Sequence, residues 1–425
     1  MDDGVIRSSI SAMLARILAI GDELVFGRTV DTNSAFLARR LTDLGFTVTG
    51  VEVVGDDHRR MAEAFEKAVA TADLVLCTGG LGPTEDDRTR LVLAEVLNRE
   101  LSESPVAWRQ IISWYRRHRP EVVVSESNRR QALMLRGAKL LANDRGTAPG
   151  LLVSTPRGQV ACFPGVPFEM RAMMERLEKR LPQLFPGLRV PTIGEVWFAG
   201  IGESAAQELI QGFLPEQNPQ TGITVNELGH ITLRARGRPA QVRRLVTSWR
   251  KALKSYLLPF PGIAPSLVDL LARTRQSIAV AESCTCGHAA AQIGAVPGAS
   301  RVLREGCVAY HNISKTARLG VSAALIARHG AVSEAVAAAM ATGMRISAGT
   351  DLAVATTGIA GPDGGSEKKP VGTVCFAVAD KRGVWTTTVR LGGERDRVQR
   401  RAASQALLYV WQVANGIIAT ADANP

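Results

Sequence analysis

The chain has 425 residues and a net charge of +11, with 46% hydrophobic and 21% charged residues. This length excludes a single small core and predicts two or three domains. No uncharged apolar run approaches the roughly 20 residues of a membrane helix, and the N-terminus has the pattern of neither a signal peptide nor a transit peptide. The six cysteines are scattered, which excludes a disulfide framework. We therefore expect a soluble, cytoplasmic protein with no membrane partner.

The first third of the chain alternates short apolar runs with amphipathic stretches. Strands are predicted at residues 15–20, 47–55 and 73–80, and helices at 32–46 and 58–72. Thr32 or Asn33 is expected to cap the first helix, and Gly45 to end it. This alternation predicts an α/β domain with a doubly wound, parallel sheet over residues 1–175.

Two further domains are predicted. In residues 176–260, Pro and Gly interrupt short strands, which is typical of a small α+β module, and the apolar stretch 257–266 is interpreted as a linker. Residues 261–425 form a second α/β domain. Its strands are expected at 277–281, 305–311, 351–358, 372–380 and 384–391, before a closing helix from about residue 396.

Ser283 lies in the sequence AESCTCG, directly after an apolar strand and before a helix. Such a turn directs backbone N–H groups and the positive end of the helix dipole at its occupant, which suits an oxyanion or a phosphate. The alternative is that Ser283 only caps the helix.

Lys315, in AYHNISK, favours a chemical role for this region. The chain contains 42 Arg but only 9 Lys, so a lysine beside a strand end is unexpected. Arginine stays protonated, whereas a desolvated lysine can lose its proton and act as a base toward a serine hydroxyl. Tyr310 ends the same predicted strand, where its hydroxyl would relay or orient a proton. A surface lysine and an edge aromatic are the alternatives.

The glycine-rich loop 356–365 follows another predicted strand. Its glycines allow close backbone approach to a ligand, although a plain connecting loop is the alternative. The blocks AESCTCG, PGASRVLREGCVAYHNISK, HGAVSEAVAAAMATG, TTGIAGPDGGSEKKPVGTV and GGERDRV follow one another in this order. From about Pro265 to Leu408 the chain therefore resembles the C-terminal domain of the CinA family.

In the enzymes it resembles, this domain hydrolyses the carboxamide of nicotinamide mononucleotide to nicotinic acid mononucleotide and ammonia. The resemblance implies that Ser283 is the nucleophile, Lys315 its general base and Tyr310 the assisting hydroxyl. Substrate contacts are implied for Thr285, Gly287, Thr357, Gly358, Gly361 and, with the phosphate, Arg395. The chemistry requires no metal or other cofactor.

Two residues depart from the family's pattern. Cys286 stands where glycine is usual, in a turn that needs close backbone approach or an unusual φ. Gln399 stands where arginine is common. The first departure bears on activity more directly than the second.

The cysteines of this region also raise the hypothesis of a zinc site. Its ligands would be Cys284, Cys286 and His288, with Cys307 or His311. Their spacing does not match the two-residue gap of a zinc knuckle, and no second Cys pair follows, so we do not favour a metal here.

Acidic and glycine residues follow two strands of the first domain. Gly79, Gly80 and Gly82 form a loop at the carboxyl end of a strand, where ligands bind in such folds. Carboxylates that would face the same crevice are Asp22 and Glu23, after the first strand, and Asp86 and Asp87, which would hold a divalent cation on a pyrophosphate. Helix-capping acids in an ordinary loop are the alternative.

The blocks IGDEL, VDTNSAFLARRL, TGGLGPTEDDRTR, NRRQALM, GTAPG and FPGVPFEM cover about Ala15 to Arg171. They resemble the molybdopterin-binding-like domain, of MoaB/MogA-like fold, at the front of CinA proteins. Full-length relatives hydrolyse ADP-ribose to AMP and ribose 5-phosphate with a divalent metal. The resemblance implies nucleotide contacts from Asn33 and a closing turn that contains Pro164 and Gly165. Molybdopterin is the competing ligand.

The middle module resembles the KH-like module of CinA proteins through its GIGES block. It has no GxxG loop, so nucleic acid is not an expected partner despite the positive charge. A spacer or dimer-forming role is expected, and the resemblance implies a homodimer. The alternative function is a non-catalytic regulator that binds a nucleotide or molybdopterin; Ser283, Lys315 and Tyr310 together speak against it, whereas Cys286 keeps it open.

Overall fold

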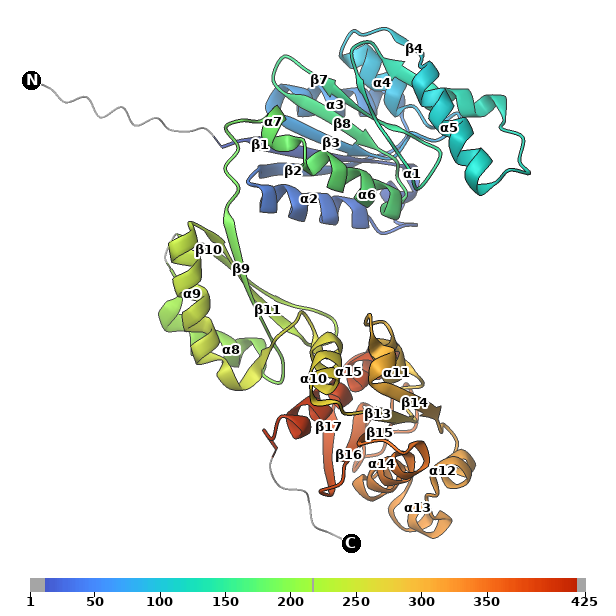
Figure 1. Ribbon diagram of the computed structural model, residues 1–425, viewed down its shortest axis with the longest axis vertical. Helices are drawn as coiled ribbons and strands as arrows, with labels where there is room; N and C mark the ends of the chain where they lie inside the picture. The colour runs from blue at the N-terminus through green and yellow to red at the C-terminus, as the bar shows by residue number, and fades with distance from the viewer. Residues whose placement is uncertain (1–11, 216–217, 419–425) are drawn as a thin grey trace, which may run out of the picture. The chain divides into compact units, whose positions relative to one another are not determined.

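The computed structural model describes residues 12–215 and 218–418, which fall into two compact units, Met1–Pro191 and Thr192–Pro425 (Figure 1). The first eleven residues, on which the expected lack of a signal peptide partly depends, lie outside the described ranges. Within those ranges no helix is long and apolar enough to cross a bilayer.

A six-stranded sheet with the order β2-β1-β3-β8-β7-β6 forms the centre of the first unit. Its strands are β1 (Leu14–Ile20), β2 (Thr47–Val54), β3 (Leu74–Thr78), β6 (Lys139–Leu141), β7 (Gly150–Ser154) and β8 (Gln159–Phe163). The first four in spatial order run parallel, and β7 and β6 continue the sheet antiparallel. A separate pair joins β4 (Leu101–Glu103) to β5 (Leu133–Leu135). Strand β3 is buried along its whole length, as a central parallel strand requires.

Helices cover both faces of this sheet (Figure 1). One core contains α3 (His58–Thr71), α4 (Thr89–Val96) and α5 (Pro105–His118), and the other contains α2 (Thr32–Leu44), α6 (Pro167–Glu178) and α7 (Leu181–Leu184). The short α1 (Asp22–Val25) follows β1. The predicted doubly wound α/β fold is confirmed. The predicted boundary at residue 175 lies inside α6, and Leu177 and Leu181 belong to the core of this unit.

The first long helix, α2, begins differently from the prediction. The Asp31 carboxylate accepts a hydrogen bond of 2.9 Å from the Ser34 amide, so the prediction that Thr32 or Asn33 is the cap is wrong. Asn33 is the second residue of the helix, and its side chain donates hydrogen bonds to Thr78 and Gly165. Gly45, with φ 103°, ends the helix as predicted.

The second unit begins with an antiparallel sheet of order β10-β11-β9-β12. Its elements are β9 (Thr192–Phe198), α8 (Glu203–Ile210), β10 (Gln220–Val225), β11 (Ile231–Gly237), α9 (Pro239–Ala252) and β12 (Leu257–Leu258). Side chains of α8 and α9 share one core with β9 and β11. As predicted, this is a small α+β module.

The stretch 257–266 is not the predicted linker. Leu258 pairs with Trp197 of β9, and Ile263 begins α10 (Ile263–Thr274). Both side chains are buried in the core of the second unit. The apolar residues therefore pack, and the Pro and Gly residues mark only the change from strand to helix.

A five-stranded sheet of order β14-β13-β15-β16-β17 completes the second unit. Its strands are β13 (Ile278–Glu282), β14 (Leu303–Val308), β15 (Leu352–Gly358), β16 (Thr373–Ala379) and β17 (Val384–Arg390). β14, β13 and β15 are parallel, and β16 and β17 are antiparallel to their neighbours.

Helices cover both faces of this second sheet as well (Figure 1). One core includes α10, α11 (His288–Gly294) and α15 (Arg395–Ala414), and the other includes α12 (Asn312–Leu319), α13 (Ala323–His329) and α14 (Glu334–Ala348). Short 3₁₀ turns lie at η1 (Glu126–Ala132), η2 (Gln211–Phe213), η3 (Lys254–Tyr256) and η4 (Ala299–Arg301). The strands and closing helix predicted here are confirmed.

Candidate functional site

Three neighbouring parallel strands bring candidate residues of the second unit to one sheet edge. Ser283 directly follows β13, Tyr310 comes after β14, and Thr357 lies near the end of β15. The Ser283 amide donates to the Thr356 carbonyl at 3.0 Å, which fixes the start of the turn against β15. The carboxyl ends of such strands are where ligands bind in α/β folds.

Lys315 and Ser283 form a buried pair. The Lys315 Nζ lies 3.0 Å from Ser283 Oγ and 3.1 Å from the Tyr310 carbonyl oxygen. The lysine is only 2% exposed, and burial lowers the pKa of its amine. Both contacts are to neutral oxygens, so the pocket holds the amine in place without stabilising its charge by a carboxylate.

The turn after Ser283 is organised by Glu282. This carboxylate is 1% exposed and accepts hydrogen bonds from the amides of Gly287, Ala289 and Ala290 at 2.9 to 3.1 Å. The first amides of α11 are therefore occupied by a protein side chain, which differs from the expectation that they face a ligand. Gly287, predicted to contact substrate, has its amide on Glu282.

The amides closest to Ser283 are arranged differently. The Cys286 amide donates to the Ser283 carbonyl at 3.2 Å and the His288 amide to the Thr285 carbonyl at 3.1 Å. Within residues 12–215 and 218–418, the amides of Cys284 and Thr285 have no hydrogen-bond acceptor. Backbone amides without a protein acceptor are the kind of donor that stabilises an oxyanion.

Cys286 is exposed and adopts φ 50°, a left-handed conformation that favours glycine. The unusual φ expected at this position is thus confirmed. Its neighbour Cys284 is buried, and burial raises the pKa of that thiol to about 12. A protonated thiol is a poor metal ligand. In the described ranges no three His, Cys, Asp or Glu side chains gather as a metal site.

Arg395, at the start of α15, connects the glycine-rich loop to Tyr310, which follows β14. Its guanidinium donates to the Gly361 carbonyl at 2.6 Å and to the Tyr310 hydroxyl. Both partners are neutral, so the cation keeps its charge for an anionic ligand. Tyr310 is 50% exposed; its carbonyl, not its hydroxyl, contacts Lys315. On the same helix, Gln399 donates to the Cys284 carbonyl at 2.8 Å and so supports the turn that follows Ser283.

The remaining predicted contacts are engaged inside the protein. The Thr285 hydroxyl bonds to the Thr356 hydroxyl at 2.7 Å, and the Thr357 hydroxyl donates to the Ala331 carbonyl at 2.7 Å. Gly358 lies so close to β16 that a Cβ would come within 2.7 Å of the Thr373 carbonyl oxygen. These residues build the walls of the site.

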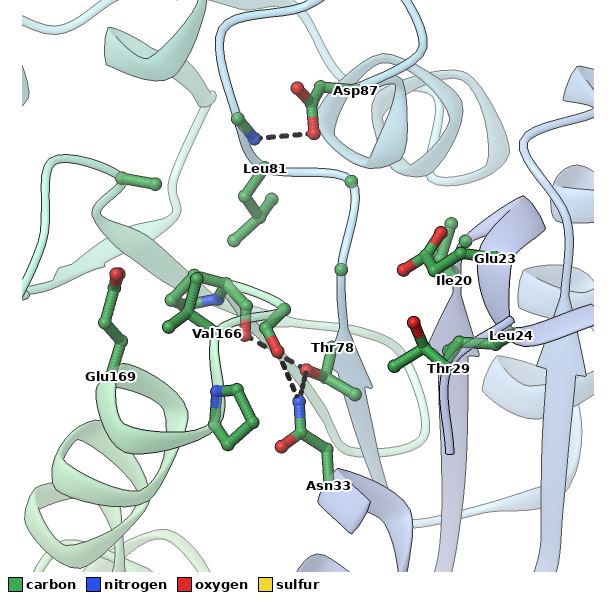
Figure 2. A pocket seen from close by; sticks show the side chains of 18 of the residues that line it. Ile20, Glu23, Leu24, Thr29, Asn33, Thr78, Leu81, Asp87, Val166 and Glu169 are labelled. Atoms are coloured by element: carbon green, nitrogen blue, oxygen red, sulfur yellow. Dashed lines mark hydrogen bonds between the residues drawn. The ribbon is translucent and has the colours of Figure 1, made fainter. Parts of the chain in front are cut away.

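A cavity of about 540 Å³ lies in the first unit (Figure 2). Most of the predicted residues line it: Glu23, Asn33, Gly79, Gly80, Gly82, Asp86, Asp87, Pro164 and Gly165. Because β1 and β3 are neighbouring parallel strands, the turns that follow them meet at this cavity, as predicted. Asp22 lies at its edge, where its amide and that of Asp56 bond to each other's carboxylates at 3.1 Å.

The glycine loop is held tightly at its base. Gly79 has φ 103°, and a Cβ there would lie 2.0 Å from the Ile20 carbonyl oxygen, so only glycine fits. Asp87 accepts hydrogen bonds from the Gly82 amide at 2.7 Å and from the Thr84 amide and hydroxyl at 2.9 and 2.6 Å. Asp87 thereby shapes the loop.

Asn33 connects this loop to the turn after β8. Its amide donates to the Thr78 hydroxyl at 3.0 Å and to the Gly165 carbonyl at 2.7 Å, and Thr78 in turn donates to the Pro164 carbonyl. The predicted approach of the Pro164 turn to the glycine loop is confirmed by this network.

Glu23, Asp56 and Asp86 also line the cavity, and their carboxylate oxygens are the kind of ligand that a divalent cation prefers. Asp86 is exposed, and hydrogen bonding within its own turn lowers the pKa of its carboxyl. The pKa of Asp56 is raised by burial and by the charges of Asp22, Asp86 and Glu23, a repulsion that a cation relieves. Within the described residues no three of these carboxylates gather as a metal site, so a cation held here by one or two of them would take its other ligands from phosphate oxygens and waters, as Mg²⁺ does.

Sequence reasoning missed several residues of these sites. Glu282 and Glu169 are buried carboxyl groups beside motif residues, and Arg90 is a buried guanidinium whose pKa burial lowers to about 10. Arg90 donates to the Leu81 and Pro149 carbonyls at 2.9 and 2.7 Å beneath the glycine loop. Of these residues, only Glu282 has a local pattern that indicates its role: it is an acidic residue directly at a strand–helix turn.

Two family models match the chain, one over each half. The model described as "CinA C-terminal domain" matches residues 262–414, and "Probable molybdopterin binding domain" matches residues 16–183. Both matches agree with the blocks from which the resemblance was inferred.

Full-length relatives are similar over nearly the whole chain. A CinA-like protein of Citrifermentans bemidjiense is 41% identical over 407 residues, which cover 93% of this chain and 96% of that protein. A CinA-like protein of Chlorobium luteolum is 37% identical over 431 residues, with 96% and 98% covered. Among solved structures, the protein CinA with unknown function from Thermoplasma acidophilum is 34% identical over 40% of this chain and 98% of that chain, with a TM-score of 0.38.

Proposed function

The chain belongs to the CinA family, and on this premise we propose that its C-terminal domain hydrolyses the carboxamide of nicotinamide mononucleotide to nicotinic acid mononucleotide and ammonia. The observation that carries the proposal is the buried Lys315 amine 3.0 Å from Ser283 Oγ. Burial favours the neutral amine, which can accept a proton, and burial of a lysine without a carboxylate partner costs stability, so a chemical role accounts for the pair better than a structural one.

The reaction follows from this pair. Lys315 accepts the hydroxyl proton of Ser283 while Oγ attacks the carbonyl carbon of the carboxamide, and the carbonyl oxygen becomes an oxyanion that faces the amides of Cys284 and Thr285. When the C–N bond breaks, Lys315 returns the proton to nitrogen and ammonia leaves. Water, deprotonated by Lys315, then attacks the ester on Ser283, releases the carboxylate product and restores the hydroxyl.

The phosphate of the substrate gives Arg395 its role. Its guanidinium, held by Gly361 and Tyr310, has five N–H donors and can pair with phosphate oxygens while it keeps these contacts. The same residue would thus order the glycine-rich loop and select a phosphorylated substrate. This proposal makes Tyr310 a substrate-side hydroxyl that Arg395 orients.

The test is ammonia release from nicotinamide mononucleotide by wild-type protein and by Ser283→Ala, each with and without a chelator. Release that persists with the chelator and disappears in the variant supports the Ser/Lys mechanism. Absence of release by folded wild-type protein contradicts it and favours a binding or regulatory role, with Cys286 as the residue to revert first.

For the front cavity we propose a second activity, the hydrolysis of ADP-ribose to AMP and ribose 5-phosphate. The specific observation is that the glycine loop and the carboxylates of Glu23, Asp56 and Asp86 border one cavity of nucleotide size. Asp86, with Asp56 or Glu23, would hold a divalent cation, which when bound neutralises pyrophosphate charge. The chain's own contribution is to bind the phosphates at the loop amides and to close the site with the Pro164 turn.

This second proposal is tested by measuring AMP formed from ADP-ribose with Mg²⁺, with a chelator and in Asp86→Asn. The Ser283→Ala variant serves as the matched control, because it alters only the other site. Metal-dependent formation that Asp86→Asn weakens supports the proposal. Binding of molybdopterin without turnover of ADP-ribose would favour the competing ligand.

A further inference from the structure

Glu169 is a buried carboxyl group in the wall of the front cavity. It lies in the first turn of α6, is 9% exposed and lines the cavity. Figure 2 shows it on the opposite side of the glycine loop from Glu23. It is therefore separate from the carboxylates that flank the proposed cation.

The surrounding chain forms a socket for this carboxylate. Asn143 donates to Glu169 Oε2 at 2.6 Å, and its other contacts are to the Ala148 carbonyl and to the amides of Arg145 and Gly146. These four bonds fix which way the Asn143 amide points. At Gly146, a Cβ would lie 2.2 Å from the Glu169 carboxyl carbon, so the backbone packs directly against the acid.

A purely structural role explains this arrangement poorly. A glutamate in the first turn of a helix commonly bonds back to the cap amide, whereas Glu169 turns to Asn143 in another segment. Its hydrogen bond is to a neutral amide, and burial raises the pKa of its carboxyl. An ionised carboxyl that lacks a cationic partner destabilises the fold. Among the described residues its second oxygen, Oε1, has no hydrogen-bond donor, and the residue lines the cavity.

We propose that Glu169 binds a ribose hydroxyl of the nucleotide in the front cavity and thereby selects a ribonucleotide. The phosphates would lie at the glycine loop, and the sugar would extend toward the α6 wall. A carboxylate that accepts from ribose hydroxyls is a common arrangement in nucleotide-binding folds, because it recognises donors that a deoxyribose or a bare phosphate lacks. The inference rests on the proposed nucleotide function of this cavity.

Calorimetric binding of AMP, 2′-deoxy-AMP and 3′-deoxy-AMP to the full chain provides the test, with wild type, Glu169→Gln and the control Glu175→Gln, an exposed acid on the same helix. We expect Glu169→Gln to weaken AMP binding about tenfold or more, the size of a hydrogen bond to a charged group. One of the two deoxynucleotides should bind the wild type as weakly as AMP binds Glu169→Gln. The affinity of this deoxynucleotide should not fall further in Glu169→Gln.

A stability measurement separates this role from a structural one. The neutral glutamine keeps the shape of the side chain and removes a buried charge, so the melting temperature of Glu169→Gln should equal or exceed that of wild type. A lower melting temperature with an unchanged deoxynucleotide penalty would overturn the inference. Equal AMP binding by wild type and Glu169→Gln would overturn it too, while leaving the proposed nucleotide function intact. Failure of wild type to bind either AMP or ADP-ribose would remove both.

Discussion

Replacement of Lys315 by methionine is the sharpest perturbation of the C-terminal site. Methionine keeps an unbranched apolar stem of similar length but removes the amine 3.0 Å from Ser283 Oγ. A general base contributes about 10²- to 10⁴-fold to a rate, and here one amine serves both acylation and deacylation. We therefore expect kcat/KM for nicotinamide mononucleotide to fall about 10³-fold, roughly 4 kcal/mol of transition-state stabilisation.

The same substitution should not harm the fold. Burial lowers the pKa of Lys315, so the folded state disfavours its protonation and loses stability as the pH falls through that lowered pKa. Methionine removes this cost of protonating a buried amine. The melting temperature of Lys315→Met at neutral pH should therefore equal or exceed that of wild type. Lys315→Arg is the matched control: the guanidinium stays charged, so this variant should be both inactive and less stable.

Three measurements decide the matter: ammonia release, thermal unfolding and the pH profile of wild type. Wild-type kcat/KM should rise with pH through the lowered pKa of Lys315 and reach its plateau below the range of an ordinary lysine, because the neutral amine is the active form. Near-normal turnover by either variant, or a rate that does not change over this pH range, would refute the assignment of Lys315 as the base.

Other residues give predictions of a different kind. In Glu282→Gln, the side-chain NH₂ group replaces one carboxylate oxygen, so one backbone N–H at the start of the helix loses its acceptor, which costs about 1–3 kcal/mol of folding free energy. We expect kcat for nicotinamide mononucleotide to fall with little change in KM, and the protein to unfold at a lower temperature. Cys286→Gly should stabilise the protein by about 1 kcal/mol in denaturant unfolding, because the left-handed φ no longer strains a side chain, and turnover should be unchanged; a slower enzyme would mean that the thiol takes part. Asp87→Ala leaves the amides of Gly82 and Thr84 without their acceptor, so KM for ADP-ribose should rise in an AMP-release assay while ammonia release stays constant.

Local patterns were sufficient to predict the elements and the position of Ser283. The change from an apolar strand to a polar turn and an Ala-rich helix places that serine at a sheet edge, and the rarity of lysine drew attention to Lys315. Both inferences depend on residues close together in the chain. The distance between the two side chains could not be predicted, because it depends on the order of β14, β13 and β15 in space.

The errors came from tertiary packing that local composition does not contain. Residues 257–266 have the Pro and Gly content of a linker, yet Leu258 and Ile263 are buried in the second unit. Glu169 and Asn143 are 26 residues apart, and neither has a local pattern that suggests a socket. Asn33, a good capping residue by type, does not cap α2, because its side chain bonds to Thr78 and Gly165 across the sheet edge.

The two candidate sites share one device, which changes how their acidic residues are interpreted. In each, a carboxylate of the motif itself accepts hydrogen bonds from the turn: Glu282 from three amides at the start of α11, and Asp87 from the amides of Gly82 and Thr84 and from the Thr84 hydroxyl. Three charge-assisted hydrogen bonds hold a glycine-containing turn in one conformation before any ligand arrives. Such acids fix geometry, and the chemistry that we propose then falls to basic or acidic groups that form no ion pair with the turns. In the C-terminal domain these are Lys315 and Arg395, and at the front cavity it is the exposed Asp86, which we propose as a cation ligand.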